Sequence, residues 1–270
     1  MRMATPFAYQ CRCRQTFALF WTLAAANFRF VMNTPQYPGL IPSYEHERLA
    51  ALQPYQVLGT PGQELFNDFV SIVAKLFDMP IALVSLVRAD DVVFIGNEGM
   101  PEAQVVPRED SMCSVAILHD DLTEFRDVAA APCALVNPYV AQQLHLGFYA
   151  GQALRSPEGQ PLGSLCIIDR RPRQLSPSEG KLLGDLAQVA QELLRLQAAQ
   201  AAGMAVSAAM RARLDATVQQ SLTRLATLAE LNAWDAAPEK ADTQRYDESR
   251  LDEARFLAQT LHRELKALLG

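Results

Sequence analysis

The sequence is short of basic charge. Lysine and arginine together number 24 against 30 aspartate and glutamate residues, which gives a net charge of −6 and a pI of about 5.3. General binding of nucleic acid requires a basic face that neutralises phosphates, so this composition argues against it. Half of the 270 residues are hydrophobic, enough for one substantial domain with extensions or for two small domains.

Cysteine and histidine are scarce and scattered. The five cysteines are Cys11, Cys13, Cys113, Cys133 and Cys166. The four histidines are His46, His119, His145 and His262. No two of these side chains stand at the spacing of a metal site beside a further pair. The pattern predicts a reduced, cytoplasmic protein with buried thiols, and it indicates no metal site.

Acidic residues are absent from the start of the chain, where the first is Glu45 and four arginines precede it. The apolar run from Phe17 to Ala26 resembles a secretory signal peptide, although it has only about half the length that spans a bilayer. Alternatively, translation starts at Met32 and residues 1–31 come from a start assigned too far upstream, or these residues are a disordered tail. We treat residues 1–43 as an N-terminal extension.

Hydrophobic periodicity predicts both helices and strands from Tyr44 onwards. A helix is expected over 44–53, and a second from an N-cap at Thr60 to about Asp78. The expected strands are 81–87, 92–96 and 122–128. The intervening segments are a loop at 99–107, a short helix at 112–118 capped by Ser111, and a loop or helical turn at 129–140.

The stretch from Gly147 to Leu196 predicts two antiparallel strands followed by a helix. Pro157 and Gly159 mark the turn between the strands. The helix start carries an N-cap at Ser176, then proline at the first helical position and a capping box completed by Glu179. About five or six antiparallel strands bracketed by helices predict an α+β layer, without βαβ crossovers.

Seven stretches in 44–196 match one family pattern in order and spacing: Leu58–Glu64 with Phe66, Pro80–Val87, Pro107–Cys113, Asn137-Pro138 with Val140, Phe148–Gly151, Leu162–Asp169 and Arg171–Leu175. On these residues the segment resembles a GAF domain, in the variant common at the N-terminus of bacterial signalling proteins. The resemblance implies a six-stranded antiparallel sheet, helices packed behind it, and a loop-covered pocket on the other face.

Three departures from that pattern concern the pocket. Cys113 is followed by Ser114, where the variant has a histidine shortly after the cysteine. Gly147 stands where an arginine is usual, and the Ala-rich stretch 129–136 replaces a polar segment. A polar ligand would lose partners at these positions, so the pocket has changed its ligand or lost it.

The side chains expected near the pocket come from the predicted strands and the matched motifs. They are Phe94, Cys113, Phe125, Asp127, Tyr149 and Cys166. A linked bilin would require a cysteine–histidine pair, which Cys113 lacks, so no bilin attachment is indicated and the cofactor is unknown. No grouping of nucleophile, base and orienting residue supports catalysis, and we expect a protein that is not an enzyme.

Residues 197–270 are expected to be helical. The helix from Pro177 is predicted to continue for about ten turns, and a second helix begins near Tyr246. Its apolar positions keep a near-heptad period: Leu251, Ala254, Ala258, Leu261, Leu265 and Leu268. The period fits a coiled coil or an antiparallel hairpin against the first helix.

The segment from Phe256 to Lys266 resembles the phospho-acceptor box of sensor histidine kinases, with one extra residue after His262. The likeness is either a coincidence in an amphipathic helix or the mark of a degenerate or truncated kinase. In the second case the chain is a phosphorelay component whose His262 accepts phosphate from another protein.

The sequence thus predicts a cytoplasmic, non-catalytic GAF-type small-molecule sensor or protein-interaction module of bacterial signal transduction. It would signal through its C-terminal helices as a homodimer, or to another signalling protein. The expected partners include an unknown small molecule or none, but neither nucleic acid nor membrane. The phosphorelay component is the alternative.

Overall fold

The computed structural model describes residues 37, 39–56, 63–203, 208–234 and 242–269. The N-terminal extension up to residue 36, with its signal-like run, lies outside these residues, as does the predicted N-cap Thr60. The described residues belong to one compact unit, 37–270.

Six antiparallel strands form one sheet in the order β3-β2-β1-β6-β5-β4. Their bounds are β1 Ile81–Val87, β2 Asp91–Glu98, β3 Val105–Pro107, β4 Thr123–Phe125, β5 Phe148–Arg155 and β6 Pro161–Asp169. The central pair joins β1 to β6, with Leu83 opposite Cys166. These two strands are buried along nearly their whole length. The predicted α+β sheet of about six strands is therefore confirmed.

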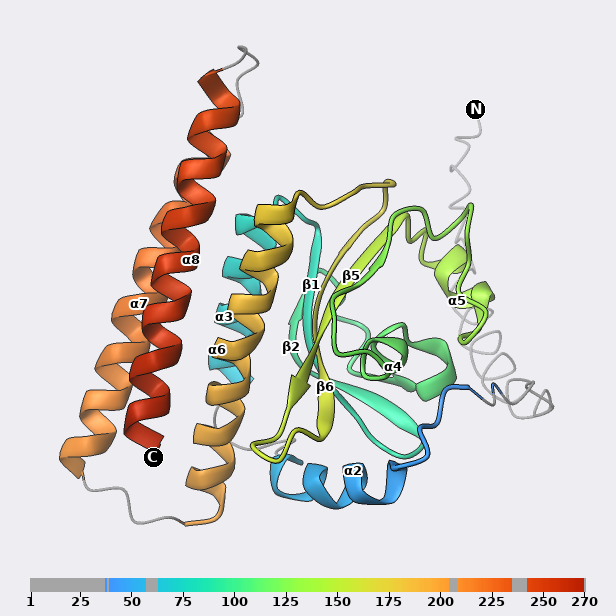
Figure 1. The fold of residues 1–270 in the computed structure, drawn as a ribbon, viewed down its shortest axis with the longest axis horizontal. Helices are drawn as coiled ribbons and strands as arrows, with labels where there is room; N and C mark the ends of the chain where they lie inside the picture. Colours follow the sequence, from blue (N-terminus) through green and yellow to red (C-terminus); the bar gives the residue numbers. More distant parts are fainter. Residues whose placement is uncertain (1–36, 38, 57–62, 204–207, 235–241, 270) are drawn as a thin grey trace, which may run out of the picture. The chain divides into compact units, whose positions relative to one another are not determined.

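Alternate side chains of the strands enter two separate apolar clusters, because successive residues of a strand point to opposite faces. Ala82 and Val84 of β1 pack with α3 (Gln63–Leu76) and α6 (Pro177–Ala201) in the larger cluster. Ile81 and Leu83 pack on the other face, against α4 (Cys113–Ala116) and nearby loops. Figure 1 shows α3 and α6 on one side of the sheet, with α4 and α5 (Pro138–Gln143) on the other.

The helix α2 (Glu45–Leu52) crosses one end of the sheet and is attached by a buried arginine. Arg48 is fully buried, and its Nη1 donates to the carbonyl oxygens of Val87 (2.7 Å) and Pro161 (3.3 Å). The carboxylate of Glu45 accepts from Arg48 and also from the buried Arg108. A 3-10 turn, η1 (Gln53–Tyr55), ends this segment.

Three local predictions were wrong. The loop at 99–107 contains the edge strand β3, which pairs with the start of β2. The strand at 122–128 shrinks to β4, because Asp127 turns the chain by accepting the N–H of Ala130. The helix at 112–118 shrinks to α4, although Ser111 caps this turn as predicted: Ser111 is extended, Met112 is already helical, and the Ser111 hydroxyl accepts the N–H of Cys113 at 3.3 Å.

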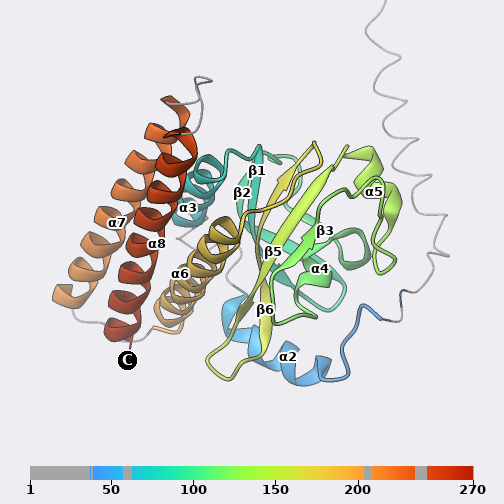
Figure 2. The ribbon, with the colours of Figure 1, turned by 45° about the horizontal axis from the view of Figure 1, so that its top comes forward.

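The C-terminal residues form two further helices, α7 (Ala208–Trp234) and α8 (Asp242–Leu269), with no ten-turn continuation of α6. The helix α6 ends at Ala201, and Gly203 follows in a left-handed conformation with φ +68°, the usual glycine stop. Figure 2 shows α6 and α8 side by side, with α7 flanking α8. A short 3-10 turn, η2 (Arg108–Asp110), completes the elements described.

The near-heptad stripe of α8 is used within the chain. Ala254, Ala258, Leu261 and Leu265 are buried in the same cluster as α6 and α7. Of the two alternatives for this stripe, the structure shows packing against other helices of the same chain. Among the described side chains of α8, Phe256 is large, apolar and exposed.

Candidate ligand pocket

Five of the six predicted pocket residues lie in the smaller apolar cluster. Phe94, Cys113, Tyr149 and Cys166 are buried there, and Phe125 packs against the cluster with its ring edge-on to Tyr149 at 6.3 Å. These side chains fill the face of the sheet that is opposite α3 and α6. Only the sixth, Asp127, lines the cavity described next.

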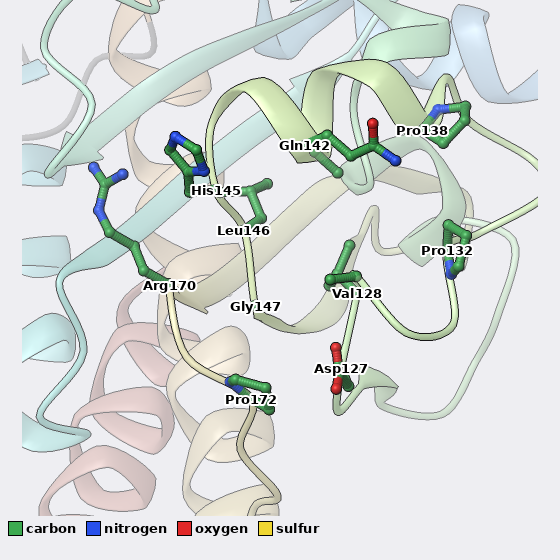
Figure 3. Close-up of a pocket in the computed structure, with 12 residues that line it drawn as sticks. Asp127, Val128, Pro132, Pro138, Gln142, His145, Leu146, Gly147, Arg170 and Pro172 are labelled. Atoms are coloured by element: carbon green, nitrogen blue, oxygen red, sulfur yellow. The ribbon is translucent and has the colours of Figure 1, made fainter.

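A cavity of about 340 Å³ lies beside the start of β5 and the end of β6. Its lining is Asp127, Val128, Ala129, Pro132, Pro138, Ala141, Gln142, His145, Leu146, Gly147, Arg170 and Pro172. In Figure 3, His145 and Arg170 lie on one side of Gly147, and Pro132 and Pro138 lie on the other. The volume falls within the range of small-molecule sites.

Backbone hydrogen bonds around Gly147 fix the floor of the cavity. The N–H of Gly147 donates to the carbonyl of Asp169 at 2.9 Å, and its own carbonyl accepts from Val128 at 2.8 Å. Three chain segments that are distant in sequence are thereby held together: the turn after β4, the start of β5 and the end of β6. Each supplies lining residues.

The wall opposite this floor is α5, which begins and ends through specific local interactions. Asn137 is its N-cap, and the side-chain oxygen of Asn137 accepts the N–H of Tyr139 at 3.1 Å. The amide of Asn137 also donates to Asp110 at 3.0 Å, which ties the helix to the segment before α4. The chain leaves α5 through His145, whose φ of +51° turns it towards β5.

The absence of a side chain at position 147 has a structural cause. A Cβ atom built there would lie 2.5 Å from the carbonyl oxygen of Arg170, closer than real Cβ atoms approach. The arginine usual at this position in the resembling pattern would therefore require the backbone of the β6–α6 loop to move. Arg170 itself lines the cavity, and its Nη1 donates to the carbonyl of Leu144 at 3.2 Å.

The lining combines apolar walls with a few polar groups of different character. Arg170 supplies a cation, Asp127 an anion, and Gln142 and His145 further hydrogen-bonding groups. Serine, threonine, cysteine, tyrosine and lysine are absent from the described lining, so no hydroxyl, thiol or amine nucleophile faces the cavity. This arrangement can bind and orient a small polar molecule.

The sequence did not identify Gln142, His145 or Arg170 as pocket residues. Arg170 could have been found, because it directly follows a predicted buried strand, where a loop side chain can face a site. His145 and Gln142 carried no such signal. Their place depends on α5, which the sequence left as an unspecified loop or helical turn.

One loop leads directly from the cavity to α6. Arg170 and Pro172 line the cavity, and Arg173 follows them. The guanidinium of Arg173 donates to the carbonyl of Phe77 at 2.9 Å and to Glu179 at 2.6 Å. Glu179 also completes the capping box with Ser176, as the sequence predicted.

His262 lies on α8, remote in sequence from the cavity lining. Its ring is half-buried, and its Nδ1 atom is buried without a hydrogen-bond partner among the described residues. Elsewhere in the described part of the chain, no three histidine, cysteine or acidic side chains gather as a metal site requires. No described helix is both long and apolar enough to cross a bilayer.

Comparison with known proteins supplies relatives for this fold. A cyclic di-GMP phosphodiesterase of Pseudomonas aeruginosa is 37% identical over 142 residues, which are 53% of this chain and 23% of that protein. The match thus spans under a quarter of the relative.

Two solved structures are also similar. One is the GAF domain of an Acinetobacter phosphoenolpyruvate-protein phosphotransferase, with 11% identity and a TM-score of 0.44, covering 58% of this chain and 97% of that one. The other is a GAF domain/HD domain protein of Geobacter sulfurreducens, with 14% identity and a TM-score of 0.42, covering 54% and 97%. The likeness to both concerns the fold alone.

The family model named GAF domain matches residues 61–205, more than half of the chain. The matched residues include every strand of the sheet, the cavity lining and the whole of α6. The chain belongs to the GAF domain family.

Proposed function

We propose that this protein is a non-catalytic sensor of a small molecule, which binds in the cavity beside Gly147 and acts on the C-terminal helices. The observation that supports this most strongly is the loop from Arg170 to Ser176. One end of that loop lines the cavity and the other end caps α6. A ligand that displaces Arg170 or Pro172 therefore pulls on the start of α6.

The ligand that suits the lining is a small polar molecule with an anionic group. The guanidinium of Arg170 is largely exposed and makes one described hydrogen bond, to a carbonyl, so its other N–H groups can donate to a carboxylate or phosphate oxygen. Asp127 and Gln142 offer acceptor atoms on the remaining surface. The proline and leucine walls exclude water from the apolar part of such a ligand.

Transmission would pass from α6 to α8. Asp185 of α6 accepts hydrogen bonds from Arg255 and Gln259 of α8, and the apolar stripe of α8 is buried beside α6. Ligand binding then shifts the population between two arrangements of these helices, because it binds one arrangement more tightly than the other. The receiver of this change is a second copy of the chain or another signalling protein.

A role in bacterial signalling is supported by the relative in Pseudomonas aeruginosa, whose name describes a cyclic di-GMP phosphodiesterase. The shared segment here is the GAF domain, which we assign the regulatory task. We place the protein in the cytoplasm. The domain would span about residues 44–196, with the helices beyond it as the signalling segment.

Native mass spectrometry of protein freshly purified from its natural cells tests the proposal. We expect a small molecule to remain bound to the wild-type chain and to be lost from an Arg170→Ala variant. Arg171→Ala is the matched control, because Arg171 is also exposed but does not line the cavity. A wild-type protein that retains nothing, or a ligand that survives Arg170→Ala, would contradict the proposal.

A further inference from the structure

Two thiols meet in the core on the face of the sheet opposite α3 and α6. The Sγ atoms of Cys113 in α4 and Cys166 in β6 are 3.7 Å apart, and both side chains are buried. The two residues are 53 positions apart in sequence, so the fold alone brings them together. Cys133 is the other described cysteine, and it is half-exposed.

The surroundings of the two thiols are more polar than the rest of this cluster. Ser85 and Ser164 of the central strands hydrogen-bond to each other at 3.1 Å, and Ser111 accepts the N–H of Cys113 at 3.3 Å. The hydroxyl of Tyr149 is buried without a partner that satisfies hydrogen-bond geometry among the described residues. Burying a hydroxyl without a hydrogen bond is costly, so the position of the Tyr149 hydroxyl beside the two thiols requires a physical reason.

The hydrogen bond between the two thiols shifts their pKa values in opposite directions. The hydrogen bond with Cys166, assisted by smaller contributions from the nearby serines, lowers the pKa of Cys113 to about 6 against the opposing effect of burial. The same bond, together with burial, raises the pKa of Cys166 well above its ordinary value. The lower pKa belongs to Cys113 and the higher one to Cys166, which suits Cys113 to attack and Cys166 to resolve.

We propose that Cys113 and Cys166 are a reversible redox modification site that forms an internal disulfide when the protein meets hydrogen peroxide. The Cys113 thiolate attacks one peroxide oxygen, the O–O bond breaks, and hydroxide leaves, which gives a sulfenic acid at Cys113. The Cys166 sulfur then attacks the Cys113 sulfur. The S–O bond breaks, and the departing hydroxyl takes the Cys166 proton as water. Two thiols lose two electrons in total, and one peroxide is reduced to two waters.

Disulfide formation requires only a small movement of the two sulfur atoms, which the short helix α4 can make. Disulfide formation needs the two sulfurs to approach by roughly 1.6 Å. Cys166 lies in a central strand paired on both sides, whereas Cys113 begins a helix of four residues. The helix α4 would therefore move towards the sheet and be fixed there. Cytoplasmic conditions keep such thiols reduced, so the bond would form only under oxidation.

The test uses the full chain with Cys11→Ser, Cys13→Ser and Cys133→Ser, which leaves the two thiols alone. The protein is treated with one equivalent of hydrogen peroxide, denatured, alkylated and analysed by mass spectrometry. We expect a loss of two hydrogen atoms, complete protection of both cysteines from alkylation, and recovery of both thiols with dithiothreitol. The disulfide should also raise Tm by about 5 °C, because it shortens the loops available to the unfolded chain.

Single substitutions separate the two roles. With Cys166→Ser, Cys113 should be trapped by dimedone as a sulfenic acid, whereas with Cys113→Ser the Cys166 thiol should remain alkylatable. The same peroxide titration on the wild-type chain requires no substitution and decides the matter if a variant does not fold. In the wild-type chain, Cys113 and Cys166 thiols that stay alkylatable while Cys133 is oxidised would overturn the proposal. A disulfide that forms only above Tm would also overturn it.

Discussion

The Nε atom of Arg255 in α8 donates to Oδ2 of Asp185 in α6 over 3.0 Å. The same carboxylate oxygen accepts from Gln259 one helical turn later, at 3.1 Å. Asp185 lies two turns from the start of α6. The loop from Arg170 to Ser176, which lines the cavity, ends there in the N-cap. This contact is therefore a polar connection between α8 and the helix that we propose receives the signal.

The Asp185–Arg255 pair should stabilise the packing of α8 measurably. Its side chains are 14% and 25% exposed, so solvent weakens the interaction less than at the surface. We expect a double-mutant cycle of Asp185→Ala and Arg255→Ala to give a coupling energy of about 1 kcal/mol in urea unfolding.

Asp252 provides the control for this cycle, since it faces the same Arg255 at 3.7 Å but is 71% exposed. The corresponding cycle with Asp252→Ala should give a coupling energy of no more than about 0.3 kcal/mol. Equal coupling energies in the two cycles would show that Asp185 does not hold α8 in place.

Two glycine substitutions should have opposite effects on stability. Gly147→Ala places a Cβ against the carbonyl of Arg170 and should lower the free energy of unfolding by about 2 kcal/mol. Gly184→Ala, in open space within α6, should raise the free energy by about 0.5–1 kcal/mol, because alanine restricts the unfolded chain. Urea unfolding measures both. A neutral Gly147→Ala would mean that the β6–α6 loop yields freely.

The stability contributed by Glu45 should depend on pH. Burial by itself raises the pKa of Glu45, but hydrogen bonds from Arg48 and Arg108 outweigh it and lower the pKa below 4.5. The folded state therefore binds this proton less tightly than the unfolded state. The resulting stability is complete above the unfolded pKa and is lost as the pH falls through the folded pKa.

Glu45→Gln should consequently lower the free energy of unfolding by about 2–3 kcal/mol near neutral pH, since it leaves two buried guanidiniums without their carboxylate. The difference from the wild-type protein should shrink below the unfolded pKa. Glu47→Gln, on the exposed side of the same helix, is the control and should change little. A Glu45→Gln deficit that grows in acid would refute the assignment.

The cap of α6 gives a further local prediction. Ser176 accepts the N–H of Glu179 at 3.2 Å, and Glu179 accepts the N–H of Ser176 at 2.7 Å. Ser176→Ala should cost about 1 kcal/mol of unfolding free energy, whereas Ser178→Ala inside the first turn should cost less. Thermal unfolding of the two variants checks the difference. Equal losses would show that the capping box adds nothing here.

Interactions between near neighbours could be predicted from the sequence. The capping box of α6 depends on residues three positions apart, and the hairpin of β5 and β6 on the turn around Gly159, which has the positive φ that such turns require. The strand β1 was predicted because six of its seven residues are apolar, Ser85 being the exception, and all seven are buried. Gly203 is a helix-ending signal in the sequence, but the prediction extended α6 beyond it.

Features that depend on distant residues could not be predicted. The edge strand β3 exists because Val105 and Val106 meet β2, although their own segment carries no strand pattern. The cavity requires the turn after β4, the helix α5 and the loop after β6 to meet at Gly147, and spacing does not encode that meeting. The partner of the α8 stripe was undecided for the same reason, since an apolar stripe does not specify which helix covers it.

The direct test of the sensor proposal is hydrogen exchange of α8 with the cavity empty and filled. The small molecule recovered from wild-type protein by denaturing extraction would be added back to protein refolded without it, with Arg170→Ala as the control. We expect exchange of the α8 amides around Arg255 and Gln259 to change in the wild-type chain and to stay constant in Arg170→Ala. Binding that leaves α8 exchange unchanged in the wild-type chain would contradict transmission from the cavity to the C-terminal helices.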